Sequence, residues 1–178
     1  MILIAVIVVH EVAHGAVANR LGDPTAKRLG RLTLNPIKHM DIYGSVLVPG
    51  LIILSGSSLL FGWAKPVPVN MVNFKKPFRD MMIVALAGPA SNILMALIAS
   101  FVLKTFLGDS GSPGVLWLMY ILTISIQINL VLAVFNLMPI PPLDGSRILM
   151  YFLSDDLKER WMKLEPYGFV IIIGLAYF

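Results

Sequence analysis

Three long apolar stretches constrain this chain more than any other feature of its sequence. They run from Met1 to Ala18, Met81 to Leu107 and Val115 to Leu137, and each approaches the roughly 20 residues that a helix needs to cross a bilayer. The chain is 57% hydrophobic, against about 45–50% in soluble domains. A further apolar run, Tyr167 to Phe178, is too short to span a membrane. We therefore expect a mainly α-helical, multi-pass integral membrane protein.

The same stretches predict a single membrane domain over residues 1–178, built as a bundle of about three to five transmembrane helices. Because the first stretch begins at Met1 and the last is short, the sequence reads as a fragment, or as a chain that lacks a helix at either end. Helices are expected over residues 1–19, 79–107, 114–137, 145–154 and 166–178.

Basic residues concentrate between the first two apolar stretches. Nine lysines or arginines lie from Arg20 to Arg79, and only two acids, Asp23 and Asp41, accompany them. Short basic loops remain on the cytoplasmic side of a membrane, so we place this segment there and expect a prokaryotic plasma membrane as the location. This preference for basic residues in cytoplasmic loops accounts for the net charge of +4. The sequence leaves the oligomeric state open.

Aromatic residues near the lysines of this basic segment predict anchoring at the membrane interface. We therefore expect the lipid bilayer as a partner, and no nucleic acid. The aromatic residues are Phe61, Trp63, Phe74 and Phe78.

The segment from Thr33 to Asn73 is apolar but repeatedly interrupted by glycine and proline. Such punctuation argues against a helix, so we expect short strands or a re-entrant segment over residues 33–74 on the cytoplasmic face. Non-helical backbone at membrane depth needs protein or a water-filled cavity beside it. A strand at 44–48 or 67–74 would offer its backbone to an extended substrate.

The first apolar stretch carries the motif His10-Glu11-Val12-Ala13-His14. Two histidines four residues apart lie on one face of a helix, and the glutamate beside them can reach water at a metal. Ionisable side chains inside a membrane helix are costly and mark functional sites. A structural alternative is that neighbouring helices satisfy the histidines and that a base pairs with Glu11. The chain contains no cysteine, so any metal must be held by histidine and carboxylate.

A catalytic zinc site usually takes three protein ligands and leaves one position to water. Asp144 is the best third candidate, because it follows three prolines that must break the third apolar helix on the cytoplasmic side. At about 1.5 Å per residue, His10 and His14 lie roughly 9–15 Å below the interface marked by Arg20. The topology brings Asp144 to the same side. His39 lies in a basic loop, and we expect an exposed histidine there rather than a ligand.

Asn92 lies in the second apolar stretch, where an amide needs a hydrogen-bond partner. Two interpretations are open. Asn92 faces the active site and binds substrate, or it forms a hydrogen bond between helices while Gly88, Ala90 and Ser91 allow close packing.

Four motifs together resemble the site-2 protease family of intramembrane zinc metalloproteases. They lie in the family's order along nearly the whole chain, in a compact form without a peptide-binding insert or a nucleotide-sensing domain. The motifs are HEVAH at 10–14, FGWAKPVPVN at 61–70, GPASN at 88–92 and NLMPIPPLDG at 136–145.

The resemblance implies one Zn²⁺ per chain, held by His10, His14 and Asp144, with Glu11 as the catalytic base. It also implies regulated intramembrane proteolysis, in which peptide bonds in or near transmembrane segments of membrane protein substrates are hydrolysed. Asn136 would position the substrate or the oxyanion. Three alternatives remain: a membrane transporter, a catalytically inactive membrane metal-binding protein, and a membrane zinc protease of soluble substrates.

Overall fold

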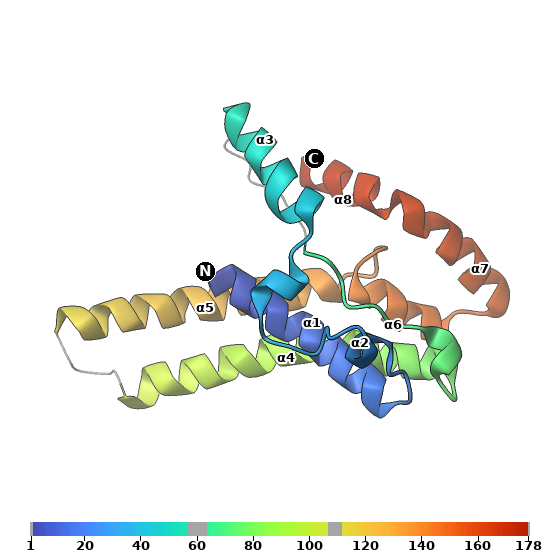
Figure 1. Ribbon diagram of the computed structural model, residues 1–178, viewed down its shortest axis with the longest axis horizontal. Coiled ribbons are helices and arrows are strands. Elements are labelled where there is room, and N and C mark those ends of the chain that lie inside the picture. The colour runs from blue at the N-terminus through green and yellow to red at the C-terminus, as the bar shows by residue number, and fades with distance from the viewer. Residues whose placement is uncertain (1, 57–63, 107–111, 178) are drawn as a thin grey trace.

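The computed structural model describes residues 2–56, 64–106 and 112–177 (Figure 1). Within these residues, three helices are long and apolar enough to cross a membrane: α1 (Ile2–Arg20), α4 (Pro77–Phe106) and α5 (Pro113–Leu137). The central helix is α4, since it packs against α1, α5 and the short helix α6 (Asp144–Phe152). The expected mainly α-helical membrane bundle is confirmed, and the spanning helices begin and end within two residues of the predicted ones.

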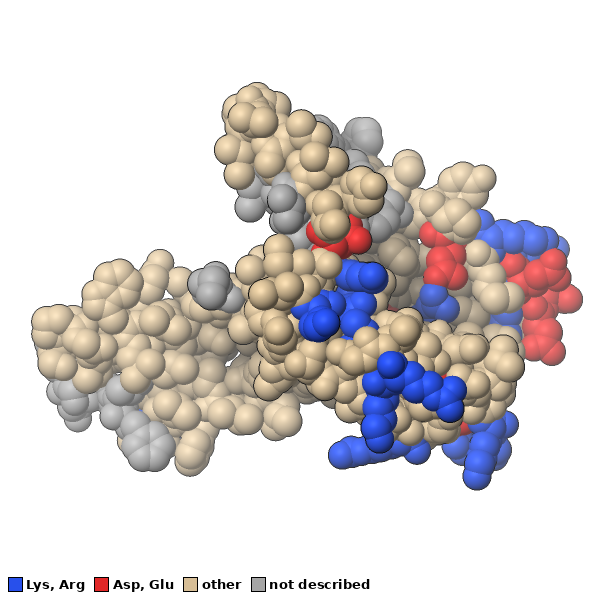
Figure 2. All heavy atoms as spheres, in the orientation of Figure 1, with Lys and Arg blue, Asp and Glu red and all other residues tan. Residues whose placement is uncertain are grey.

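The side chains that α4 and α5 expose are apolar along much of their length. On the C-terminal half of α4 they include Leu94, Leu97 and Phe101, and on the N-terminal half of α5 they include Leu116 and Trp117. In Figure 2 the lysine, arginine, aspartate and glutamate side chains gather toward the opposite end of the molecule. Exposed leucine and phenylalanine are unfavourable in water and favourable against acyl chains. The C-terminal half of α4 and the N-terminal half of α5 therefore lie in the bilayer.

The first spanning helix ends where the backbone reaches Gly22. Gly22 has a φ of 112°, a conformation that side chains disfavour, and the Asp23 N–H donates to the Ala18 carbonyl at 2.9 Å. This bond satisfies one of the carbonyls that the end of a helix leaves free. The chain then forms the short helix α2 (Thr25–Arg28) beside α1.

Asp23 ties the extended segment 65–70 to the end of α1. Its carboxylate accepts hydrogen bonds from the Asn70 N–H at 2.7 Å, the Asn73 amide at 2.7 Å and the Thr25 N–H at 3.1 Å. Burial raises the pKa of Asp23, but these hydrogen bonds outweigh burial and hold the pKa below its ordinary value. The carboxylate therefore stabilises the fold above the ordinary pKa of aspartate, and this contribution disappears as pH falls through the lowered folded-state value.

Phe74 follows this segment and lies in the core between α1 and α4. The expectation that Phe74 anchors the chain at the membrane interface is wrong, because packing against the two helices leaves it 6% exposed. Phe78 is half-buried, with Lys158 Nζ 4.4 Å from its ring centre. Phe61 and Trp63 lie outside the described residues.

Residues 42–54 are helical, contrary to the expectation of strands or broken backbone. The π-helix η2 (Ile42–Leu47) runs directly into α3 (Val48–Leu54), which stands away from the bundle in Figure 1. Pro49 lies at the junction of η2 and α3, in the first turn of α3. The chain turns after α3 at Gly56, whose φ of 74° suits glycine.

The described residues contain no β-strand, so the strands predicted at 44–48 and 67–74 are wrong. Residues 65–70 are extended but do not pair with another strand. Their backbone N–H groups donate to the side chains of Glu11 and Asp23 and to the His39 carbonyl. They lead into the 3₁₀ turn η3 (Met71–Asn73), which the Asn70 side chain caps by accepting from the Val72 N–H at 3.1 Å.

His39 is buried, whereas the sequence predicted an exposed histidine. It closes the 3₁₀ helix η1 (Pro36–His39), is 2% exposed, and its Nε2 donates to the Thr33 carbonyl at 2.8 Å. The His39 carbonyl accepts from the Lys65 N–H at 2.9 Å, and Arg31 donates to the Lys65 carbonyl at 2.7 Å. His39 and Arg31 thus hold the beginning of segment 65–70.

The chain leaves α5 through the proline-rich turn at 138–143 and enters α6. Gly145 lies so close to the Leu137 carbonyl that an added Cβ would overlap it, which brings the start of α6 against the end of α5. Two of the expected helices, 145–154 and 166–178, correspond to α6 and α8 (Gly168–Tyr177). Between them lie α7 (Asp155–Leu164), which the sequence patterns did not predict, and the 3₁₀ turn η4 (Glu165–Tyr167).

Asp23→Ala removes a buried acceptor and leaves its N–H donors without a partner. We expect the free energy of unfolding to fall by about 1–3 kcal/mol, measured by thermal and denaturant unfolding of the detergent-solubilised chain with circular dichroism. Asp156→Ala is the matched control, because Asp156 is exposed on α7. Equal stability of Asp23→Ala and the control would contradict the anchoring role of Asp23.

Candidate active site

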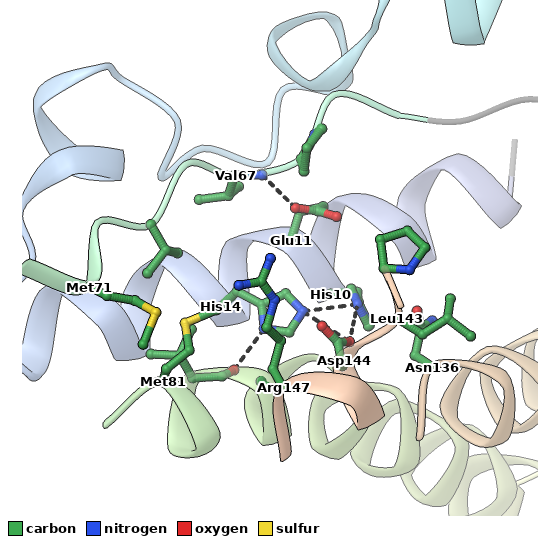
Figure 3. Close-up of a pocket in the computed structure, with 15 residues that line it drawn as sticks. His10, Glu11, His14, Val67, Met71, Met81, Asn136, Leu143, Asp144 and Arg147 are labelled. Carbon is green, nitrogen blue, oxygen red and sulfur yellow. Dashed lines mark hydrogen bonds and ion pairs between the residues drawn. The ribbon is translucent and has the colours of Figure 1, made fainter. Parts of the chain in front are cut away.

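A cavity of about 350 Å³ lies between α1, α4, α6 and the extended segment 65–70 (Figure 3). Its wall combines apolar side chains from α4 and the segment with polar side chains that come mainly from α1 and α6. The polar lining residues are His10, Glu11, His14, Asn136, Asp144 and Arg147.

Two histidines and an aspartate bring three potential metal-ligand atoms together at this cavity. His10 Nε2 and His14 Nε2 lie 3.0 Å apart, and Asp144 Oδ2 lies 3.2 Å from the first and 3.3 Å from the second. The histidines are one turn apart on α1, and Asp144 is the first residue of α6. Among the described residues, no other group of histidine and carboxylate side chains converges in this way.

The second nitrogen of each imidazole determines the tautomer. His10 Nδ1 donates to Asn92 Oδ1 at 2.8 Å, and His14 Nδ1 donates to the Val84 carbonyl at 2.7 Å. With protons on Nδ1, both Nε2 atoms direct lone pairs toward each other and toward the Asp144 carboxylate. One extra proton would satisfy one of these three close pairs, whereas a cation at their centre satisfies all three. The site therefore fits a metal ion.

The spacing of the three atoms also fits zinc. Bonds of about 2.0–2.1 Å at a tetrahedral angle place neighbouring zinc ligands about 3.3 Å apart, close to the observed separations of 3.0, 3.2 and 3.3 Å. All three residues line the cavity, which leaves a fourth coordination position open. Three protein ligands and one open position are typical of catalytic zinc sites, whereas structural sites are closed by four protein ligands.

Glu11 lies beside the three ligand candidates, on the cavity wall (Figure 3). Its Oε2 accepts a hydrogen bond from the Val67 N–H at 2.7 Å, so segment 65–70 orients the carboxylate. Gly15 allows this close approach, because an added Cβ would lie 2.9 Å from the Val67 side chain. No sequence pattern predicted Val67 as the partner of Glu11, since a backbone N–H carries no residue signature.

The two asparagines proposed to bind substrate occupy different positions. Asn136, near the end of α5, lines the cavity, and its amide donates to the Leu132 carbonyl at 2.9 Å. Asn92 is fully buried in α4 and contacts His10. The hydrogen bond between helices is therefore present and goes to one histidine of the site, while substrate binding by Asn92 stays a prediction.

Arg147 also lines the cavity, although the sequence motifs did not single it out. It follows Asp144 by three residues on α6 and forms an ion pair with Glu165 of η4. The spacing of three residues between Asp144 and Arg147 could have predicted this position, because residues three apart share a helix face.

Both imidazoles fit against α4 because residue 88 is glycine. An added Cβ at Gly88 would overlap His14 Nε2 and would lie 2.5 Å from His10 Cε1. The rings cannot retreat without loss of the hydrogen bonds to Asn92 and Val84. The glycine of the GPASN motif therefore permits the close packing of α1 and α4 that forms the site.

Gly88→Ala is expected to displace the imidazoles and to lower zinc affinity by at least about tenfold, the lower range seen when ligand orientation is disturbed. Competition with a chromophoric chelator would measure the affinity of the purified chain. Gly114→Ala on α5 is the matched control, because a Cβ there meets nothing within 4 Å. Unchanged zinc affinity in Gly88→Ala would contradict the packing argument.

Known proteins match this chain along nearly its whole length. A family model described as Peptidase family M50 matches residues 1–110 and 111–176. The Bacillus subtilis (strain 168) protein named "Putative zinc metalloprotease YwhC" is 42% identical over 97% of this chain and 77% of its own length. The Mycolicibacterium smegmatis protein named "Putative zinc metalloprotease Rip2" is 31% identical over 93% of this chain, which spans 61% of that relative. No solved structure matches the chain.

These matches confirm the resemblance that the four motifs predicted. They agree with the three membrane-spanning helices and with the converging histidines and aspartate. The chain belongs to peptidase family M50, the site-2 protease family of integral membrane zinc metalloproteases.

Proposed function

We propose that the chain is an intramembrane zinc endopeptidase that binds one zinc ion through His10, His14 and Asp144. The observation that carries the proposal is the triangle of ligand atoms, 3.0–3.3 Å apart, with lone pairs directed to one point beside a cavity. When bound, zinc polarises the scissile carbonyl and lowers the pKa of water at the site to about 7.

Glu11 is the proposed catalytic base. It accepts a proton from the attacking water while the water oxygen bonds to the carbonyl carbon and the C=O electron pair moves to the carbonyl oxygen. The same carboxyl then gives the proton to the amide nitrogen as the C–N bond breaks, which leaves a carboxylic acid and an amine. The Val67 N–H holds Glu11 Oε2 throughout, so the second carboxylate oxygen is available for the proton.

The two asparagines have separate proposed roles. Asn92 acts through His10, because its Oδ1 holds the imidazole in the tautomer that leaves Nε2 free to bind metal. Asn136 lines the cavity and is proposed to contact the substrate.

We propose membrane proteins as substrates, cut in or near their transmembrane segments. The metal ligands His10 and His14 belong to a helix able to span a membrane, and Val69, Val84 and Ala85 add apolar surface to the cavity. A substrate helix must unwind locally before its backbone can be attacked. Pro66, Val67 and Val69 line the cavity beside Glu11 and offer a place for such a segment to lie.

We place the site toward the cytoplasmic side of a prokaryotic plasma membrane, where its action would be regulated intramembrane proteolysis. The basis is the positive-inside rule applied to the loop between α1 and α4. A transporter would not require a glutamate between the two histidines, and membership in a peptidase family favours hydrolysis. A catalytically inactive metal-binding protein differs in lacking turnover, which the following measurement detects.

Glu11→Gln is expected to abolish hydrolysis of a model transmembrane peptide, with kcat reduced at least about 10²–10⁴-fold, while zinc content stays at that of the wild type. The amide can still accept from the Val67 N–H but cannot take a proton from water. Glu159→Gln, an exposed site on α7, is the control for the same substitution. Retained cleavage in Glu11→Gln would remove this residue from the role of base.

Asp144→Ala is expected to lose most of its zinc, because two imidazoles alone leave the site with too few ligands. Asn92→Ala keeps all three ligands, so we expect a smaller loss, about 10–100-fold in zinc affinity. Mass spectrometric metal analysis and chelator competition would measure both. Zinc bound equally well by Asp144→Ala and wild type would exclude Asp144 as a ligand.

A further inference from the structure

Arg147 is the one lysine or arginine among the described residues that line the active-site cavity. It lies three residues after Asp144 on α6, so both side chains leave the helix on the same face. Figure 3 shows Arg147 among the cavity side chains with His14 and Asp144. The guanidinium therefore belongs to the polar part of the cavity, where peptide hydrolysis would take place.

Glu165 holds Arg147 from the side of η4. The two side chains form an ion pair, with 27% of Arg147 and 38% of Glu165 exposed. An added Cβ at Gly168 would overlap the Pro141 carbonyl, so the chain just after Glu165 packs directly on the turn that precedes Asp144. A guanidinium has five N–H donors, and a pair with one carboxylate leaves others available to a substrate.

Peptide hydrolysis converts a neutral carbonyl oxygen into an oxyanion, and a donor already directed at that oxygen accelerates the reaction. Asn136 is a weaker candidate, because it is uncharged and one of its two amide N–H groups already donates to the Leu132 carbonyl. Glu11 and Asp144 are acceptors when ionised. Arg147 combines a permanent positive charge with free donors, which are the properties that an oxyanion requires.

We propose, on the basis of the proposed peptidase function, that Arg147 donates hydrogen bonds to the oxyanion that forms from the scissile carbonyl oxygen. Arg147 is then a catalytic residue, and Glu165 is a positioning residue that acts through it. Arg147 transfers no proton in this step. The proton taken from water still passes through Glu11 to the amide nitrogen.

Steady-state kinetics of the zinc-loaded, detergent-purified full chain on a model transmembrane peptide test this inference. We expect Arg147→Gln to lower kcat about 10²–10³-fold, as for loss of one oxyanion donor, with KM changed by less than about threefold. Arg147→Lys should recover part of the loss because it restores the charge, and Glu165→Gln should lower kcat less than Arg147→Gln does. Arg160→Gln, exposed on α7, is the control.

Binding of a phosphinic peptide distinguishes catalysis from a structural role, because its anionic tetrahedral phosphorus group imitates the oxyanion. Arg147→Gln should bind it at least about tenfold more weakly than wild type. In a Glu11→Gln background, where the peptide stays intact, Arg147→Gln should bind the uncleaved peptide with unchanged affinity. Zinc content measured on the same samples should be equal in all variants.

The inference is overturned if Arg147→Gln keeps the wild-type kcat, or if Arg147→Gln and Arg147→Lys both lose zinc or fold. These results are distinct from failure of the proposed function. Absence of hydrolysis by zinc-loaded wild type contradicts the peptidase proposal and this inference with it. Hydrolysis by wild type and by Arg147→Gln at equal kcat contradicts the role of Arg147 alone.

Discussion

The packing of α1 against α4 at Gly88 is the constraint on which the rest of the structure depends. It brings His10 and His14 against a helix that supplies one hydrogen-bond acceptor to each ring, Asn92 Oδ1 and the Val84 carbonyl. An unsatisfied polar group is costly inside a membrane helix. These acceptors satisfy Nδ1 of both rings, and a metal shared with Asp144 would satisfy both Nε2 atoms.

Glu11, beside the three candidate ligand atoms, is held by a segment outside the helix bundle. Segment 65–70 directs the Val67 N–H at Glu11, and the segment is itself held by Asp23 at one end and by His39 and Arg31 at the other. The loop between the first two spanning helices therefore controls the orientation of the proposed base. Stability at the membrane surface and geometry at membrane depth are coupled through one extended segment.

The turn after the third spanning helix, α5, positions the remaining groups of the site. Gly145 lets α6 begin directly against the end of α5, which places Asp144 beside the histidines. Helix α6 also places Arg147 at the cavity, and Glu165 of η4 forms an ion pair with it. The proposed base, Glu11, comes from α1 and Arg147 comes from α6, so these two groups enter one cavity from separate elements. Peptide hydrolysis needs this separation, because proton abstraction and stabilisation of the oxyanion occur at different atoms.

Hydrophobic length and ligand spacing are local properties, so the sequence by itself determined the three spanning helices, the histidine pair of α1 and Asp144 as its candidate partner. The sequence pattern did not predict the helical backbone at 42–54 or the burial of His39. Only the tertiary structure decided which groups orient the site: the partners of Glu11 and His10 lie 56 and 82 residues away in the sequence. Such contacts arise from the packing of distant segments, which a local sequence pattern does not encode.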